Sequence, residues 1–301
     1  RIRHRIFLGR WSFVASFLLT PMQKTARPFR FALLALAALF IPASLHAAEP
    51  LKFVSWNLEW FPGHRPTASA AEADAHMKAA QEALKKINPD IFVGVEIHDW
   101  AAFHELVSVV PGLTVNAVTS FCDPETGELR PQQIGIASKL VCRSAMWENW
   151  AANMPDMSRG FSFAALQIPD AGVLMVYGNH LKSNRGSDNE DGAKNVAAMR
   201  DDQARQLLAH REKIKKAYAK DTIFGWIASG DFNTNHDNQF PFCHAVKIIT
   251  DGGYFNTWAN TPKEKRLTWK PDAKSKFEPT TFDYIFTEGL KQTDAVMLEV
   301  P

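Results

Sequence analysis

The sequence predicts an α/β fold in which sheets pack face to face and helices form the outer layers. Three observations lead to this expectation. Strand-like apolar segments outnumber helix-like ones, many neighbouring strands are joined by short turns, and two long helical segments are interspersed among them. Such a pattern lets each sheet bury one face against the other sheet and its opposite face under helices. Neither an internal repeat nor a long linker interrupts the pattern, so one domain is expected.

The first half of the expected domain alternates strands and helices. The elements expected in order are a strand at 51–61, a helix at 70–88, a strand at 90–96, a short helix at 99–109 and a hairpin at 113–142. The first strand alternates large apolar residues with others, and the first helix has an apolar stripe at helical spacing. An Asn-Pro pair then ends that helix, because the residue before a proline disfavours the helical conformation.

The second half begins with two strands and closes with another. The elements expected in order are strands at 161–168 and 172–181, a polar Gly-rich loop at 183–195, a helix to about 219, a strand at 221–232, a mixed region to 262, a charged loop at 263–279 and a final strand at 281–286. The helix has apolar residues on one face, and the strands are core-type apolar runs.

The first 47 residues are not expected to belong to the domain. Basic residues from Lys24 to Arg30 precede an apolar run of 15 residues at 31–45, and small residues follow it. This layout is typical of a secretory signal peptide, and the run is shorter than the roughly 20 residues of a spanning helix. We therefore expect residues 1–47 to be an upstream segment plus signal peptide, residues 48–301 to be the domain, and the protein to be periplasmic or secreted. An uncleaved membrane anchor is the alternative.

Charge and cysteine content exclude several classes of function. Without the seven basic residues of 1–47, 27 Lys and Arg face 32 Asp and Glu, a formal charge of −5. A broadly basic nucleic-acid-binding surface is therefore not indicated, because such binding uses many Lys and Arg contacts to phosphate. Cys122, Cys142 and Cys243 form no CxxC pair, which argues against a zinc cluster or a thiol nucleophile. An exported protein could hold one disulfide and one free thiol among them, and the pairing stays open.

Several core-type strands end on a residue that can bind a cation or move a proton. They end on Asn57, on Glu96, on His180, and on Asp231 followed by Asn233. Positions i and i+2 of an extended chain point to the same side, so Asp231 and Asn233 are aimed at one point. Any one of these residues alone is also typical of a turn, a cap or a structural histidine. If the strands lie side by side, however, their polar ends gather at one rim.

The residue types at these strand ends suit one kind of chemistry. Carboxylates and amides without cysteine favour a hard cation such as Mg²⁺ or Mn²⁺. An imidazole beside them suits proton transfer or stabilisation of charge on phosphate oxygens. Lys182 could add a cation, although a surface lysine is the ordinary reading. The set indicates metal-assisted hydrolysis of a phosphate ester.

Six short motifs occur together along the chain. In order they are SWNLEWF, DIFVGVE, QQIGIASK, GNHLKS, SGDFNTN and FDYIF. With them the sequence resembles the endonuclease/exonuclease/phosphatase superfamily, which is deoxyribonuclease I-like. The resemblance implies a four-layer α/β/β/α sandwich with a single active-site rim. It also implies roles for individual residues.

The roles that the resemblance implies are those of a metal-dependent phosphoesterase. Glu96 resembles the metal-binding glutamate, and Asn57 is similar to the asparagine that helps to hold metal or phosphate. His180 resembles the histidine that contacts the scissile phosphate. Asp231 resembles the aspartate that orients or deprotonates the attacking water, and Asn233 its partner at phosphate and nucleophile.

The resemblance is weaker at two further positions. Arg159 matches a phosphate-binding arginine by position alone. Asp283 resembles the carboxylate that orients a catalytic histidine, which belongs to a Ser-Asp-His motif expected some 20 residues after the strand 281–286. The sequence ends at Pro301 without that motif. Either it is a fragment, which we favour, or the protein has lost the group, and a last C-terminal strand is expected to be missing as well.

The sequence therefore predicts a Mg²⁺- or Mn²⁺-dependent hydrolase of phosphoester bonds, a phosphodiesterase or nuclease. The alternatives are a phosphomonoesterase, a sphingomyelinase-like lipid phosphodiesterase, or a non-catalytic protein that binds phosphoester or metal. The expected partner is a phosphoester substrate, nucleic acid included, with no stable protein partner and membrane contact only through an uncleaved signal segment. The basic loop around Trp269 could touch a phosphate backbone and stack on a base, although such loops are more often simply solvated.

Overall fold

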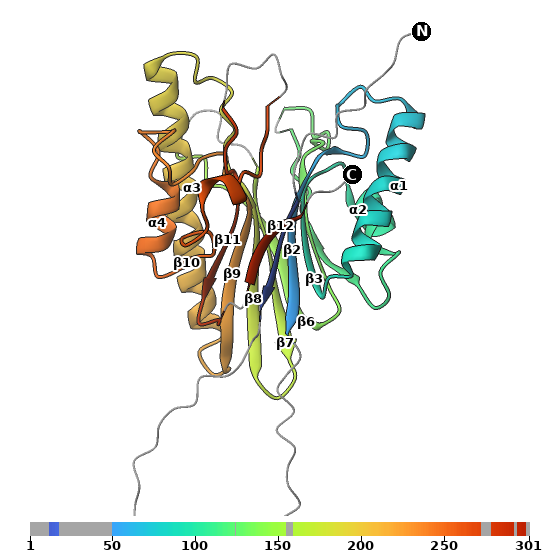
Figure 1. Ribbon diagram of the computed structural model, residues 1–301. Coiled ribbons are helices and arrows are strands. Elements are labelled where there is room, and N and C mark those ends of the chain that lie inside the picture. Colours follow the sequence, from blue (N-terminus) through green and yellow to red (C-terminus); the bar gives the residue numbers. More distant parts are fainter. Residues whose placement is uncertain are drawn as a thin grey trace, which may run out of the picture.

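Two sheets packed face to face form the centre of the computed structural model, and helices cover both outer faces (Figure 1). The structure describes residues 12–17, 50–123, 125–154, 159–271, 278–291 and 294–298. The predicted signal peptide, at residues 22–47, lies outside these residues and stays a prediction. Within the described part of the chain, no helix has the length and apolar character needed to cross a membrane.

The first sheet has six strands in the order β12-β1-β2-β3-β5-β4. Their bounds are β1 Ser12–Phe17, β2 Leu51–Phe61, β3 Ile91–Ile97, β4 Thr114–Val118, β5 Gln133–Ser138 and β12 Asp294–Leu298. Strands β2 and β3 run parallel, and the other neighbours are antiparallel. Helices α1 (Ala70–Ile87) and α2 (Trp100–Val107) lie over the outer face of this sheet.

The second sheet also has six strands, in the order β10-β11-β9-β8-β7-β6. Their bounds are β6 Val141–Asn149, β7 Gly160–Ile168, β8 Gly172–His180, β9 Ile223–Asp231, β10 Phe255–Asn256 and β11 Asp283–Glu288. Strands β8 and β9 are parallel neighbours. Helices α3 (Glu190–Ala217) and α4 (Ala245–Asp251) cover its outer face, and a short 3₁₀ helix, η1, spans Lys263–Lys265.

Side chains along β2 alternate between two apolar clusters, one on each face of the first sheet. Val54, Trp56 and Leu58 pack in the apolar cluster beneath α1 and α2. Phe53 points the other way, into the core shared with the second sheet. Because side chains of a strand alternate between faces, Asn57 points toward the second sheet as Phe53 does. The period-two pattern of the sequence therefore places a polar residue at the rim between the two sheets.

A glycine lets the two sheets approach at the level of the site. A Cβ built at Gly178 of β8 would lie 2.6 Å from Ser162 Oγ, 2.8 Å from Ile134 Cγ2 and 3.0 Å from Val93 Cγ1. Ile134 and Val93 belong to the opposite sheet. A side chain at this position would push the sheets apart two residues before His180.

The structure corrects three expectations about elements. The predicted loop 183–195 ends early, because Asn189 caps α3 by accepting the backbone N–H of Gly192, and α3 begins at Glu190. The strand predicted at 281–286 is not the final one, since β12 follows it. Residues 12–17, which the sequence analysis assigns to the upstream segment, form strand β1 between β2 and β12.

All three cysteines are free, so the disulfide that an exported protein could hold is not formed in the structure. The prediction that a further C-terminal strand is missing stays a prediction.

Candidate active site

Three site residues lie in one row across neighbouring strands of the second sheet. His180 is the last residue of β8 and is the register partner of Asp231, the last residue of β9. On the other side of Asp231, its antiparallel partner is Asp283, the first residue of β11. Directly opposed residues on antiparallel strands, such as Asp231 and Asp283, have Cα atoms about 4.5–5.5 Å apart. The rim therefore concentrates one imidazole and two carboxylates.

The first sheet adds two residues to the same rim. Asn57 comes from β2, and Glu96 comes from β3 at a register irregularity between Val95 and Ile97. Glu96 has a φ of 61°, in the left-handed region that a residue with a side chain rarely adopts. A bulge of this kind redirects a side chain that regular alternation would point elsewhere. Here it allows the Glu96 carboxylate to face the second sheet.

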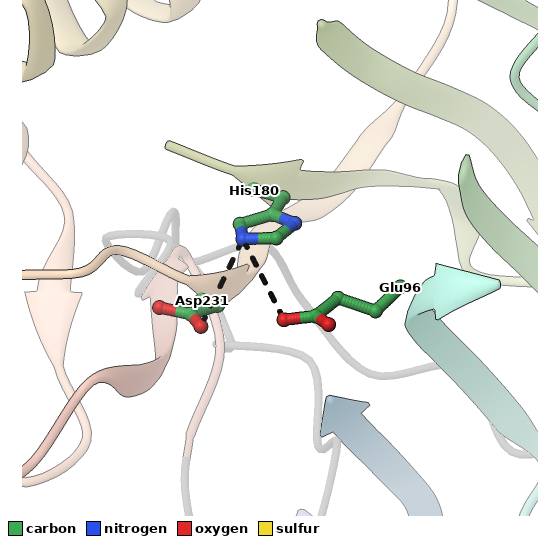
Figure 2. A group of neighbouring side chains, drawn as sticks. All are labelled: Glu96, His180 and Asp231. Atoms are coloured by element: carbon green, nitrogen blue, oxygen red, sulfur yellow. Dashed lines mark ion pairs between the residues drawn. The ribbon is translucent and has the colours of Figure 1, made fainter. Parts of the chain in front are cut away.

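Side chains from both sheets meet at the rim. Asn57 Nδ2 donates to Glu96 Oε1 at 2.9 Å and to Asp231 Oδ2 at 2.9 Å. His180 Nε2 lies 4.0 Å from Glu96 Oε1 and 3.9 Å from Asp231 Oδ2, and Figure 2 shows the imidazole facing both carboxylates. All of these side chains are buried. The expectation that distant strand ends converge around one small gap agrees with this geometry.

The cluster fits a hard divalent cation. One ligand atom from each of Glu96, His180 and Asp231 lies within 4.8 Å of the other two. Two buried carboxylates repel one another unless a positive charge lies between them, and carboxylate oxygens are the usual ligands of Mg²⁺ and Mn²⁺. Asn57 holds both carboxylates through its nitrogen, while its Oδ1 accepts the Glu59 N–H at 3.0 Å. In this orientation Asn57 positions the carboxylates of Glu96 and Asp231. Its role as a metal ligand stays a prediction.

Arg159 reaches the site through a residue that the sequence analysis did not select. Its guanidinium donates to Leu181 O at 3.3 Å and to Gln132 Oε1, and Gln132 Nε2 donates to Glu96 Oε2 at 3.0 Å. Burial lowers the pKa of Arg159, while the charges of Glu96 and Asp231 act in the opposite direction. Arg159 is thus a partly buried cation near the carboxylates, and its role in binding phosphate stays a prediction.

We expect Gln132→Ala to weaken cation binding about tenfold while leaving the fold intact. Loss of the amide removes a donor to Glu96 Oε2, which also accepts the Trp60 N–H at 3.2 Å. Substitution of groups that orient metal ligands typically costs about 10- to 100-fold in metal affinity or activity. The measurement is the apparent Mg²⁺ dissociation constant from an activity titration. Gln167→Ala, whose amide donates to carbonyls at the far end of β7, is the matched control, and an unchanged Mg²⁺ constant in Gln132→Ala would contradict the assignment.

Asn233 is held in place by a second residue that sequence reasoning missed. Its backbone is left-handed, with φ at 51°, and its N–H donates to Asp231 Oδ1 at 2.8 Å. Its carbonyl accepts from Arg200 Nη1 at 2.7 Å and from Asn184 Nδ2 at 3.0 Å, and its own Nδ2 donates to Leu181 O at 3.2 Å. Arg200 therefore fixes the turn that follows β9.

Lys182 and Asp283 are the remaining predicted site residues. The Lys182 ammonium donates to the carbonyls of Ser183 at 3.3 Å and Arg185 at 2.8 Å, so its charge lies at the loop after β8. Asp283 lies beside Asp231 in the sheet, and its backbone N–H donates to Thr268 Oγ1 at 3.0 Å. The contributions of Lys182 to substrate binding and of Asp283 to catalysis stay predictions.

No family model matches the sequence, and no curated protein has a significantly similar sequence. Solved structures, in contrast, share the fold. A truncated TDP2 from Caenorhabditis elegans has a TM-score of 0.54 at 18% identity, over 79% of this chain and 83% of that one. A β-hairpin deletion mutant of beta toxin from Staphylococcus aureus has a TM-score of 0.54 at 19% identity, over 83% and 91%. An endonuclease/exonuclease/phosphatase family protein from Bacteroides thetaiotaomicron has a TM-score of 0.51 at 16% identity, over 79% and 81%. These likenesses confirm the predicted fold.

Proposed function

Because the chain has the fold of the endonuclease/exonuclease/phosphatase superfamily, we propose that it is a divalent-cation-dependent hydrolase of phosphodiesters. The observation that carries this proposal is the buried cluster of Glu96, His180 and Asp231 at the rim between the sheets. A buried group of two carboxylates and an imidazole has little structural value in itself, since desolvating charges costs free energy. Such a group is typical of a site that binds a cation and a charged substrate.

Glu96 and Asp231 would hold the cation, with His180 beside them. When bound, a divalent cation there neutralises the negative charge that develops on the phosphate oxygens. Arg159, partly buried near the carboxylates, would add a fixed positive charge for the phosphate. The donor network from Asn57 and Gln132 would keep the Glu96 carboxylate in one orientation.

Asp231 would align a water molecule for attack on phosphorus and accept its proton. Its Oδ1 is already held by the N–H of Asn233, so the carboxylate is preorganised. As the new P–O bond forms, the bond from phosphorus to the leaving alcohol oxygen breaks, and that oxygen must gain a proton. His180, whose Nε2 lies 3.9 Å from Asp231 Oδ2, would stabilise the phosphate oxygens or protonate the leaving group.

The proposal is tested by supplying the protein with three substrates in Mg²⁺ buffer. We expect turnover of bis(p-nitrophenyl) phosphate, a diester, above the protein-free rate and in preference to p-nitrophenyl phosphate, a monoester. Vesicles containing sphingomyelin are the third substrate. Preference for the monoester would favour a phosphomonoesterase, and preference for the vesicles a lipid phosphodiesterase. Binding of the diester without turnover would contradict the enzyme assignment and favour a binding protein.

A further inference from the structure

A buried arginine of α3 joins the two chain segments that follow β8 and β9. Arg200 is 2% exposed, and its Nη1 donates to Asn184 Oδ1 at 2.8 Å, in the loop after β8. The same Nη1 donates to Asn233 O at 2.7 Å, in the turn after β9. A longer contact of 3.4 Å reaches Lys182 O. Because a buried charge costs free energy unless it is hydrogen-bonded, the guanidinium keeps these acceptors close to one another.

The two segments are also bonded directly to each other. Asn184 Nδ2 donates to Asn233 O at 3.0 Å, which completes a three-way junction with the guanidinium. Asn233 Nδ2 donates to Leu181 O at 3.2 Å, and the Leu181 N–H donates to Asp231 O at 2.9 Å. Leu181 directly follows His180 in the sequence. The junction is therefore connected to the backbone on which both the imidazole and the carboxylate of the second sheet are carried.

A second side chain of α3 holds the same loop. Gln203 is 1% exposed, and its Oε1 accepts the Lys182 N–H at 2.9 Å. Positions three apart on a helix lie on one face, so Arg200 and Gln203 reach the loop side by side. Replacing a buried charge with a well-packed apolar side chain is often neutral or even stabilising. The polar contacts of α3 are therefore better explained by the geometry they impose than by stability.

The junction lies one bond away from the proposed base. The Asn233 N–H donates to Asp231 Oδ1 at 2.8 Å, and Asp231 Oδ2 lies 3.9 Å from His180 Nε2. Asn233 has a φ of 51°, a left-handed conformation that persists only where surrounding contacts enforce it. A displacement of about 1 Å, caused far from the reacting atoms, can cost about 10²-fold in rate. Loosening the junction should therefore reach the chemistry through Asn233.

We infer that Arg200 is a positioning residue of the proposed reaction and sets the distance between His180 and Asp231 by holding the segments after β8 and β9 together. The inference rests on the proposed function and adds to it a residue that acts on protein atoms and not on the substrate. Its contribution belongs to the transition state, where the geometry of the site matters, and should therefore appear in kcat and not in KM.

The test measures steady-state kinetics on bis(p-nitrophenyl) phosphate in Mg²⁺ buffer. We expect Arg200→Gln to lower kcat about 10- to 100-fold with KM changed less than about twofold, since supporting groups of a site typically contribute that much. Arg200→Lys keeps a cation with three donors and should recover part of the loss. Asn184→Ala, which removes a neutral side chain of the junction, should lower kcat in the same direction but less.

A double variant shows whether the two side chains act together. Arg200 and Asn184 both donate to the carbonyl of Asn233, so their effects on kcat should not multiply. We expect the kcat of Arg200→Gln/Asn184→Ala to lie within about threefold of that of Arg200→Gln alone, whereas independent effects would combine in full.

Arg211→Gln is the matched control. Arg211 is a second buried arginine of α3, about 16 Å further along the helix, and it donates to Glu288 Oε2 at 2.6 Å and to Gly252 O at 2.8 Å. Its loss should lower the melting temperature, because it leaves buried partners unpaired, but should leave kcat as in the wild type. A fall in kcat equal to that of Arg200→Gln would show that any buried arginine of α3 has this effect and would overturn the inference.

The remaining outcomes decide the inference in each case. A higher KM at unchanged kcat in Arg200→Gln would overturn it in favour of direct contact with the substrate, and multiplicative effects in the double variant would overturn it as well. Asn184 is half-buried in a loop, so if Arg200→Gln does not fold, unchanged kcat in Asn184→Ala overturns the inference and a lower one supports it.

If the wild type hydrolyses none of the substrates, the proposed function fails, and exchange of the Asn233 amide hydrogen, followed by NMR, decides the positioning role. Faster exchange in Arg200→Gln and Asn184→Ala than in the wild type and Arg211→Gln would support that role, because the N–H is protected by its bond to Asp231. Equal exchange in all four proteins would overturn it.

Discussion

Replacing Asp231 by asparagine is expected to lower kcat/KM for a phosphodiester by about 10² to 10⁴, the range that a positioned general base contributes. The substitution keeps the size of the side chain and removes its charge. In the wild type, Asn57 Nδ2 donates to one oxygen of the Asp231 carboxylate and the Asn233 N–H donates to the other. An asparagine at this position has only one oxygen and carries an amide nitrogen in place of the second. One of those two donors would then face another donor, so the network that holds Glu96 is disturbed as well. Steady-state kinetics on bis(p-nitrophenyl) phosphate measure the effect.

Asp251→Asn is the matched control for this variant. Asp251 is exposed at the end of α4 and pairs with Lys247 at 2.6 Å, an exposed ion pair of the kind that contributes at most about 1 kcal/mol. We expect its kcat/KM to equal that of the wild type, and circular dichroism should show both variants folded. Retention of more than about a tenth of wild-type activity in folded Asp231→Asn would exclude Asp231 as the base.

Removal of divalent cations by a chelator is expected to reduce phosphodiester hydrolysis to the protein-free rate, and addition of Mg²⁺ or Mn²⁺ in excess of chelator should restore it. The reason is the composition of the cluster, in which carboxylates of Glu96 and Asp231 meet without a cysteine. Without a cation these charges repel an incoming phosphate instead of binding it. The measurement is initial rate against free cation concentration.

Stability provides an independent readout of the same cation. A ligand that binds only the folded state at 100 times its dissociation constant adds about 2.7 kcal/mol to the free energy of unfolding. The melting temperature should therefore rise with Mg²⁺ in the wild type and rise much less in Glu96→Gln, which removes one carboxylate charge. Full activity in the presence of chelator, together with a melting temperature insensitive to Mg²⁺, would rule out the cation mechanism.

Much of the fold follows from patterns that are visible in the sequence. Period-two alternation predicted Val54, Trp56, Leu58 and Trp60 on one face of β2, and the structure packs the first three beneath α1 and α2. Trp60 lies outside that cluster, because its backbone is left-handed, with φ at 50°, and breaks the alternation. Strand ends at Glu96, His180 and Asp231 were recognisable because a carboxylate or imidazole follows an apolar run directly. Their convergence depends on strand order, which the periodicity of the sequence does not predict. The single active-site rim was an implication of the resemblance.

The parts that sequence reasoning missed act through tertiary contacts. Gln132 precedes β5 instead of following a strand, so no rule about strand ends selects it, although it is the first residue of the QQIGIASK motif. Arg200 lies within α3, where a charged residue is expected to face solvent, yet it is buried against the turn after β9. The left-handed backbone of Glu96 has no signal either, since glycine and asparagine are the residues that normally indicate such a conformation.

The cluster draws Asn57 and Glu96 from one sheet and His180 and Asp231 from the other. Neither half of the sequence contains all four of these residues. Asn57 and Asp231, which are hydrogen-bonded to each other, are 174 positions apart. The site is therefore complete only when the two sheets are docked, and partially folded or proteolytically separated halves should be inert. Recovery of turnover during refolding would for that reason report docking itself, later than the return of secondary structure.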